Sequence, residues 1–301
     1  MVLIKKAFLL VFLFLLAGIS KSFPQSRKAR IIEDDLKHSI EFTDTPQRVI
    51  SLAPNLTEMI FTLGEGKNLI ANTTYCNYPP QAKTKIKVAD LVSVDYEKIL
   101  EFAPDLILMT VEGNKKITYD KLKKFGFKIF VSNPRNFEGI KKTLKDLARI
   151  FDVEPKADSI LKDWNRKVKE IQKRHGEKRK AMFLVSLNPL MLAGKNTFLN
   201  EYFRFCRLEN IAADSPANYP VFSREQVLER APEVILLPKE NFHGVKSLLQ
   251  IFPEWAEIPA VKNGAVIPID PDLFFRPGPR FVTALEQLSK LLEEHFSTKK
   301  E

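Results

Sequence analysis

Short unbroken apolar runs alternate with amphipathic segments along most of the chain. The apolar runs lie at residues 48–52, 69–72, 106–109, 128–131, 181–187, 234–237 and 265–269. Runs this short and this continuous are typical of strands buried on both faces of a parallel sheet. The intervening segments carry apolar residues every three or four positions, as helices do, at 57–63, 119–125, 137–151, 197–206 and 280–296. Strands that alternate with helices in this way predict an α/β fold.

One amphipathic segment, residues 155–175, is longer than the others. Leu161, Trp164, Val168 and Ile171 recur at helical spacing and therefore share one face. At about 1.5 Å per residue, a helix of this length spans about 30 Å. It could connect two lobes, although the same pattern would also suit a core helix within one lobe.

A twelve-residue stretch occurs twice. Residues 97–108 read EKILEFAPDLIL and residues 225–236 read EQVLERAPEVIL, with seven of twelve positions identical. Each copy predicts a short helix that stops before a proline, followed by a buried strand. Two copies this far apart indicate two similar α/β lobes, and clefts between domains are common sites for small ligands.

Local signals predict two further features. A hairpin is expected at residues 31–42, where two β-like arms flank the polar residues 34–37. After the strand at 48–52, Asn55 is expected to cap the next helix, and Glu58 to interact favourably with the dipole of that helix.

The N-terminus predicts export. Lys5 and Lys6 precede an apolar run at 7–17, and small residues follow. This order is typical of a cleaved secretory signal peptide, with an uncleaved anchor helix as the alternative. No cysteine directly follows the run, so we expect no lipid anchor and a periplasmic location.

Charge, cysteine and histidine positions argue against a nucleic-acid partner, a disulfide and a metal site. The formal net charge is +10, but the lysines are scattered over predicted helix faces without interleaved aromatic residues, so we expect no nucleic-acid partner. Cys76 and Cys206 fall in different predicted lobes and are expected to be separate thiols, although export permits a disulfide. The four histidines lie far apart, which argues against a metal site.

The sequence lacks the common catalytic motifs, whereas the loops after strands carry residues suited to ligand binding. The sequence has no GxSxG, Walker A or GxGxxG motif, so we expect no catalytic residues. Ligands of α/β proteins bind at loops beyond the carboxyl ends of strands. Such loops here combine aromatic residues with Asn, Asp and Arg, at residues 54–55, 75–79, 188–190, 218–220 and 272–280.

Four segments carry a resemblance to a known family. They are RVISLAPNLTE (48–58), TTYCNYPPQAK (73–83), YPVFSREQVLERAP (219–232) and DLFFRPGPR (272–280). Over residues 46–296 the chain resembles the periplasmic substrate-binding proteins of ABC importers for vitamin B12 and ferric siderophores, and is most similar to the cobalamin-binding branch. The resemblance implies two Rossmann-like lobes joined by a single long helix.

The expected domain organisation follows from these observations. It comprises a signal peptide (1–22), a leader segment with a β-hairpin (23–47), an N-terminal α/β lobe (48–153), a linking helix (154–177) and a C-terminal α/β lobe (178–301). One stiff helix is a poor hinge, so we expect only a small lobe closure.

The resemblance also implies a ligand and its contacts. The ligand would be cobalamin or another corrinoid, bound as cargo and not as a cofactor. The implied binding residues are Pro54, Tyr75, Leu190, Tyr219, Asp272, Phe274 and Arg276. Where relatives have tryptophans, this chain has Tyr219, Leu91, Val111 and Leu273, which leaves haem or a ferric chelate as alternatives. An anionic siderophore would favour clustered arginines, for which Arg276 and Arg280 are the candidates.

The glutamates that open the two repeat copies gain a role from the resemblance. In such receptors an exposed glutamate on each lobe docks with arginines of the importer's membrane subunits, and the matching positions here are Glu97 and Glu225. We therefore expect a monomeric, non-enzymatic receptor. An exported α/β enzyme and a sensor domain are the alternatives from other classes.

Overall fold

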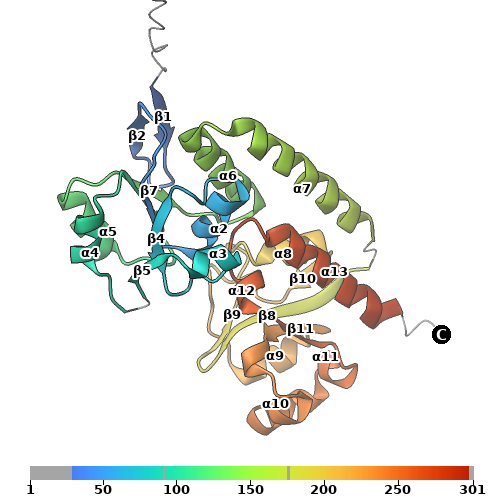
Figure 1. The fold of residues 1–301 in the computed structure, drawn as a ribbon. Coiled ribbons are helices and arrows are strands. Elements are labelled where there is room, and N and C mark those ends of the chain that lie inside the picture. The colour runs from blue at the N-terminus through green and yellow to red at the C-terminus, as the bar shows by residue number, and fades with distance from the viewer. Residues whose placement is uncertain (1–28, 91, 175–176, 298–301) are drawn as a thin grey trace, which may run out of the picture.

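Two α/β lobes make up the protein in the computed structural model, which describes residues 29–90, 92–174 and 177–297 (Figure 1). The sheet of the N-terminal lobe is entirely parallel, in the order β5-β4-β3-β6-β7. Its strands are β3 (Val49–Ser51), β4 (Leu69–Thr73), β5 (Ile86–Ala89), β6 (Leu106–Thr110) and β7 (Ile129–Ser132). The expected signal peptide at 1–22 lies outside the described residues.

The sheet of the C-terminal lobe has four parallel strands in the order β10-β8-β11-β12, with β9 antiparallel to β8. Its strands are β8 (Arg179–Leu187), β9 (Leu190–Leu192), β10 (Leu208–Asn210), β11 (Val234–Pro238) and β12 (Val266–Ile269). The short strands β5, β9 and β10 were not predicted, since segments of three or four residues often carry too little pattern to detect.

Helices cover both sheets. In the N-terminal lobe they are α2 (Pro54–Thr62), α3 (Pro80–Lys83), α4 (Tyr96–Phe102), α5 (Lys116–Lys124) and α6 (Phe137–Phe151). The long α7 (Glu154–Arg174) leads to the C-terminal lobe. That lobe has α8 (Asn200–Phe205), α9 (Arg224–Arg230), η1 (Lys239–Asn241), α10 (Val245–Ile251), η2 (Pro253–Glu257), α11 (Pro259–Lys262), α12 (Pro271–Phe274) and α13 (Phe281–Ser297). None of the helices within the described ranges combines the length and the apolar character that a membrane crossing requires.

Successive residues of the central strands face two separate layers of helices. In β6, Leu106 and Leu108 belong to the cluster that contains α2 and α6, whereas Ile107 and Met109 belong to the cluster that contains α4 and α5. All four are nearly or fully buried. A strand covered on both faces has no polar side, which explains the unbroken apolar runs.

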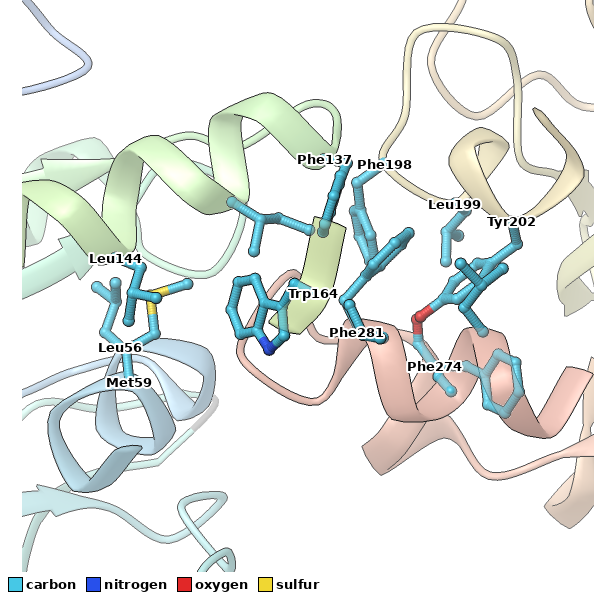
Figure 2. Packing of buried hydrophobic residues seen from close by; sticks show 14 of the residues in the cluster. Leu56, Met59, Phe137, Leu144, Trp164, Phe198, Leu199, Tyr202, Phe274 and Phe281 are labelled. Atoms are coloured by element: carbon cyan, nitrogen blue, oxygen red, sulfur yellow. The ribbon is translucent and has the colours of Figure 1, made fainter. Parts of the chain in front are cut away.

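The inner helical layers of the two lobes merge into one hydrophobic core (Figure 2). The ring of Phe137 from α6 lies 5.3 Å from that of Phe281 from α13 and 5.5 Å from that of Phe205 from α8. Trp164 of α7 packs on the same ring at 6.2 Å. The core therefore runs continuously from one sheet to the other.

The long helix α7 bridges the two lobes along one side of the molecule (Figure 1). Lys141 of α6 donates to Asn165 at 3.2 Å, and Lys167 pairs with Glu286 of α13 at 3.3 Å. The helix thus contacts elements of both lobes, which excludes the reading as a core helix of one lobe. The expected fold class, two α/β lobes joined by a single long helix, is confirmed.

The repeated stretch folds the same way in both lobes. The helices α4 and α9 each end at an alanine in the left-handed region, Ala103 at φ 39° and Ala231 at φ 48°. A proline follows each alanine, so neither helix can continue. The strands that follow, β6 and β11, pair in parallel with β3 and β8, the first strands of the two lobe sheets. The predicted helix, proline and strand are thus present in both copies.

The hairpin of β1 (Arg30–Glu33) and β2 (Ser39–Phe42) packs against the edge of the N-terminal sheet. The carboxylate of Asp34 accepts from the backbone N–H of Val131 at 3.3 Å, and that of Asp35 accepts from Asn133 at 2.6 Å. An uncovered sheet edge is a template for aggregation, and two carboxylates on the edge of β7 block it.

Candidate ligand-binding cleft

A cavity of about 250 Å³ lies between the lobes at the carboxyl ends of the N-terminal strands. Its walls include Pro54 after β3, Glu112 after β6, Asn133 after β7, and Phe275 and Arg276 after α12. The strands β3 and β6 are neighbours from which the chain winds in opposite directions. Such a switch point opens a crevice in α/β sheets, which is why the cavity forms here.

Arg276 is the hub of a polar network beside this cavity. Its guanidinium donates to Glu58 at 2.9 Å and to the side-chain oxygen of Asn77 at 2.8 Å. It also donates to the backbone oxygen of Tyr75 at 3.2 Å and pairs with Asp272. Asn77 in turn donates to Asp272 at 2.5 Å. The network joins the loop after β4 to the segment that follows α12, across the two lobes.

Glu58 binds a second arginine from the C-terminal lobe. Arg280 donates to both oxygens of this carboxylate, at 2.8 and 2.7 Å. Its guanidinium also lies 4.2 Å from the ring centre of Tyr78. The Glu58 side chain is only 1% exposed, so its charge depends on the two arginines for compensation. Sequence analysis placed Glu58 at a helix dipole; the structure instead makes it the buried centre of an inter-lobe ion cluster.

The start of α2 packs closely against the other lobe. Pro54 is the first helical residue and Ala53 is the N-cap, so the prediction that Asn55 caps this helix is wrong. The side chain of Asn55 instead donates to the backbone oxygen of Pro277 at 3.3 Å. A Cβ on Gly278 would stand 3.2 Å from the Cβ of Asn55. Glycine at that position is what allows the segment after α12 to approach α2.

Glu112 lines the opposite part of the cavity and contacts both lobes. It forms an ion pair with Arg135, and each of these side chains is about one-third exposed. The hydroxyl of Tyr219, from the C-terminal lobe, donates to the two carboxylate oxygens at 3.3 and 3.5 Å. Burial, together with the charge of Glu112, raises the pKa of Tyr219, so the phenol keeps its proton and acts as the donor.

Backbone pairing positions Tyr219. The residues on either side of it bond to the segment that contains β9: Leu192 N–H donates to Pro220 O at 3.0 Å, and Gly194 N–H donates to Asn218 O at 2.8 Å. A Cβ on Gly194 would lie 3.1 Å from that same oxygen. Because Gly194 has no side chain, the segment 218–220 can approach the segment that contains β9 closely enough to form these bonds.

Five of the seven predicted binding residues are at the cleft or in its polar network: Pro54, Tyr75, Tyr219, Asp272 and Arg276. The side chains of the other two are directed into the cores. Leu190 is 7% exposed in β9, and Phe274 is 0% exposed and packs on Tyr202, with ring centres 5.2 Å apart (Figure 2). The adjacent Phe275 lines the cavity in place of Phe274. Leu91 lies outside the described residues.

Sequence analysis missed several members of the site: Asn77, Glu112, Arg135 and Phe275. Glu112 and Arg135 follow β6 and β7 within three residues, so the rule that ligands bind beyond strand ends could have found them. Asn77 lies in the loop 75–79 that was expected to bind ligand, but its partners Asp272 and Arg276 lie almost 200 residues away in the chain, so its role in the network had no local signal.

The repeated glutamates are exposed on their helices. Glu97 is in the first turn of α4, capped by Asp95, and Glu225 is in the first turn of α9, capped by Ser223. Hydrogen bonds from its own backbone N–H and from Ser223 lower the pKa of Glu225, so it is charged at neutral pH. Both side chains are exposed at the same place in their helices, and the helices α4 and α9 belong to different lobes (Figure 1).

The two cysteines are separate thiols, as expected. Cys76 and Cys206 are buried free thiols, and burial raises the pKa of Cys206 to about 12. Across residues 29–90, 92–174 and 177–297, no group of three or more His, Cys, Asp and Glu side chains could hold a metal ion.

Residues 49–273 match the family described as periplasmic binding protein. The chain belongs to this family. Members are solute-binding proteins of the periplasm, so the chain is a solute receptor of that kind. Vitamin B12-binding protein of Photorhabdus laumondii is 34% identical over 254 residues, which cover 84% of this chain and 90% of the relative. The corresponding protein of Pectobacterium atrosepticum is 33% identical over 257 residues, covering 83% and 89%.

Solved structures of periplasmic binding proteins have the same fold. The crystal structure of the periplasmic vitamin B12 binding protein BtuF of Vibrio cholerae matches with a TM-score of 0.73 at 30% identity, covering 83% of this chain and 98% of that one. The periplasmic heme-binding protein BhuT matches with a TM-score of 0.74, covering 84% and 99%, but at 22% identity this similarity extends to the fold alone.

Proposed function

We propose that the protein captures cobalamin or a related corrinoid in the inter-lobe cleft and delivers it to an ABC importer. The observation that carries the proposal is the charge balance of the cleft. Three arginines (Arg135, Arg276 and Arg280) face three carboxylates (Glu58, Glu112 and Asp272), and every arginine is paired. A corrinoid with neutral carboxamide side chains suits such a surface. The similarity to vitamin B12-binding proteins supports the same ligand.

The alternative ligands fit this charge balance less well. Haem carries carboxylates and many ferric siderophores are anionic, so both would be recognised best by arginines free to form bidentate contacts. Here Arg280 makes two bonds to Glu58, and Arg276 is shared among Glu58, Asp272 and Asn77. An anionic ligand would have to break these bonds and leave the buried Glu58 without compensation.

In this proposal the ligand contacts come from both lobes. Tyr75 and Tyr219 supply aromatic faces, while Asp272 and Arg276 supply polar contacts. Phe275 replaces Phe274 as the aromatic contact of the C-terminal lobe, because only Phe275 lines the cavity. Pro54 contributes apolar wall, and Leu190 supports the tyrosine segment from the core side.

Delivery requires a second surface, which we assign to Glu97 and Glu225. Both are exposed, and each opens an equivalent helix on its own lobe. Opposite charges on importer membrane subunits would steer and orient such a pair. The protein would be a non-enzymatic monomer, exported to the periplasm by a cleaved signal peptide at residues 1–22 and free of a lipid anchor.

Calorimetric titration tests the ligand. Residues 23–301 are titrated with cyanocobalamin, and with haem and a ferric hydroxamate in parallel. We expect one-to-one binding of cyanocobalamin with a Kd below about 1 µM, equivalent to roughly −8 kcal/mol. Binding of haem or the hydroxamate without cyanocobalamin would refute the corrinoid assignment, and chemical conversion of the recovered ligand would refute the non-enzymatic role.

A further inference from the structure

The cavity is small for the proposed ligand. Its volume of about 250 Å³ lies below the roughly 300–1,000 Å³ of pockets that hold drug-sized ligands. A corrinoid therefore needs more room than this cavity alone offers. The lobes share a continuous core, so we look for that room among the side chains that meet across the cleft.

Glu112 and Tyr219 are such a pair. They come from different lobes, and the hydrogen bond from the Tyr219 hydroxyl to the Glu112 carboxylate joins the lobes at a residue that lines the cavity. The Glu58 cluster also joins the lobes, but the Glu58 side chain is only 1% exposed, and two arginines hold it in place. Glu112 is about one-third exposed and is the contact that a ligand can displace at lower cost.

Displacement leaves the carboxylate in need of a new partner. A polar group that loses its hydrogen bond and is covered by a ligand weakens binding, and a charged group weakens it more than a neutral one. A primary carboxamide on the ligand supplies the missing N–H donor. A carboxylate on the ligand offers no donor, repels Glu112, and finds Arg135 already engaged in the ion pair.

We propose that Glu112 is a specificity-determining residue of this cleft, which accepts a hydrogen bond from a carboxamide of the corrinoid and rejects a carboxylate at the same position. This inference rests on the proposed function. It adds that a carboxamide is the ligand group recognised and that Glu112 is the residue that recognises it.

The test compares cyanocobalamin with its monocarboxylic acids, in which one carboxamide is replaced by a carboxylate of nearly the same shape. The separate isomeric acids are titrated by calorimetry. We expect the wild-type protein to bind at least one acid about tenfold or more weakly than cyanocobalamin, equivalent to about 1.4 kcal/mol. In Glu112→Gln the ratio should fall to about twofold, because the amide can donate to the carboxylate and Arg135 becomes available to it.

Two further variants control for indirect effects. Glu112→Asp keeps the charge and should keep the discrimination. Glu209→Gln removes an exposed carboxylate in β10, at the amino end of the C-terminal sheet, and should leave all affinities unchanged. Thermal melting of each variant shows that it is folded.

Each outcome decides the inference. Loss of discrimination in Glu112→Gln alone supports it. Tight cyanocobalamin binding with no discrimination in the wild type, or with full discrimination in Glu112→Gln, overturns the role of Glu112 and leaves the receptor function standing. Absence of cyanocobalamin binding by the wild type overturns both.

Discussion

In the N-terminal lobe, β6 lies between β3 and β7, and in the C-terminal lobe β11 lies between β8 and β12. Each of these strands begins within a copy of the repeat, after a short helix, a left-handed alanine and a proline. Away from the repeat the lobes differ. The N-terminal sheet has five parallel strands, whereas the C-terminal sheet replaces one of them with the antiparallel β9.

The difference extends to the residues that face the cleft. The N-terminal lobe contributes the acids Glu58 and Glu112, and the C-terminal lobe contributes Arg276, Arg280 and Tyr219. Neither lobe has a satisfied cleft surface without the other. The repeat thus preserves a framework and two exposed glutamates, while the divergent loops carry complementary chemistry.

The largest effect is expected for a substitution in the core that the two lobes share. Phe137→Ala removes the ring that contacts helices on both sides, and such truncations cost about 3–5 kcal/mol. Phe130→Ala, in β7 of the N-terminal lobe, should cost a similar amount. We expect scanning calorimetry to show one transition for the wild type and Phe130→Ala but two for Phe137→Ala. Two transitions in the wild type would contradict a common core.

The Glu58 cluster tests whether the acids of one lobe stabilise the other. Glu58→Gln leaves two largely buried arginines without full compensation, and we expect a loss of about 3 kcal/mol in the free energy of unfolding, measured with urea. Glu101→Gln, on the exposed face of α4, should change it by less than about 0.5 kcal/mol. Equal effects of the two variants would show that the cluster adds nothing.

The two repeat glutamates, Glu97 and Glu225, test whether equivalent positions on the two lobes form the proposed docking surface. Glu97→Lys and Glu225→Lys should each reduce uptake of labelled cyanocobalamin roughly tenfold, and roughly a hundredfold together, because each loses an attractive charge pair. Ligand affinity by calorimetry should stay within about twofold, since neither residue is at the cavity. Glu209→Lys is the matched surface control. Normal uptake by the double variant would remove the docking proposal.

The smallest expected effect is the change in shape on binding. Because the lobes share a core and one long helix, we expect the radius of gyration to change by less than about 1 Å when ligand is added. X-ray scattering with and without cyanocobalamin measures it. A large compaction would show that the lobes move as independent bodies.

The main helices and most strands follow from local sequence pattern. The helix α6 was predicted with the bounds it has, Phe137–Phe151, and α7 to within one residue at each end of Glu154–Arg174. Amphipathic period and buried apolar runs are set by nearest neighbours along the chain, and a proline stops a helix wherever the fold places it. The helix, proline and strand of the repeated stretch could also be predicted without tertiary information, since both copies have the same local sequence pattern.

The assembly of the cleft depends on contacts that the sequence does not order. Phe274 and Phe275 are adjacent and alike, but in the folded protein Phe274 is buried against Tyr202 whereas Phe275 lines the cavity. Glu58 meets its two arginines more than 200 residues along the chain, because the shared core brings the lobes together. The amino-acid sequence alone specified the elements through local periodicity and the two-lobe plan through the repeated stretch. Tertiary packing decided which charges meet across the cleft, because their pairing is set by the distance between lobes and not by position in the chain.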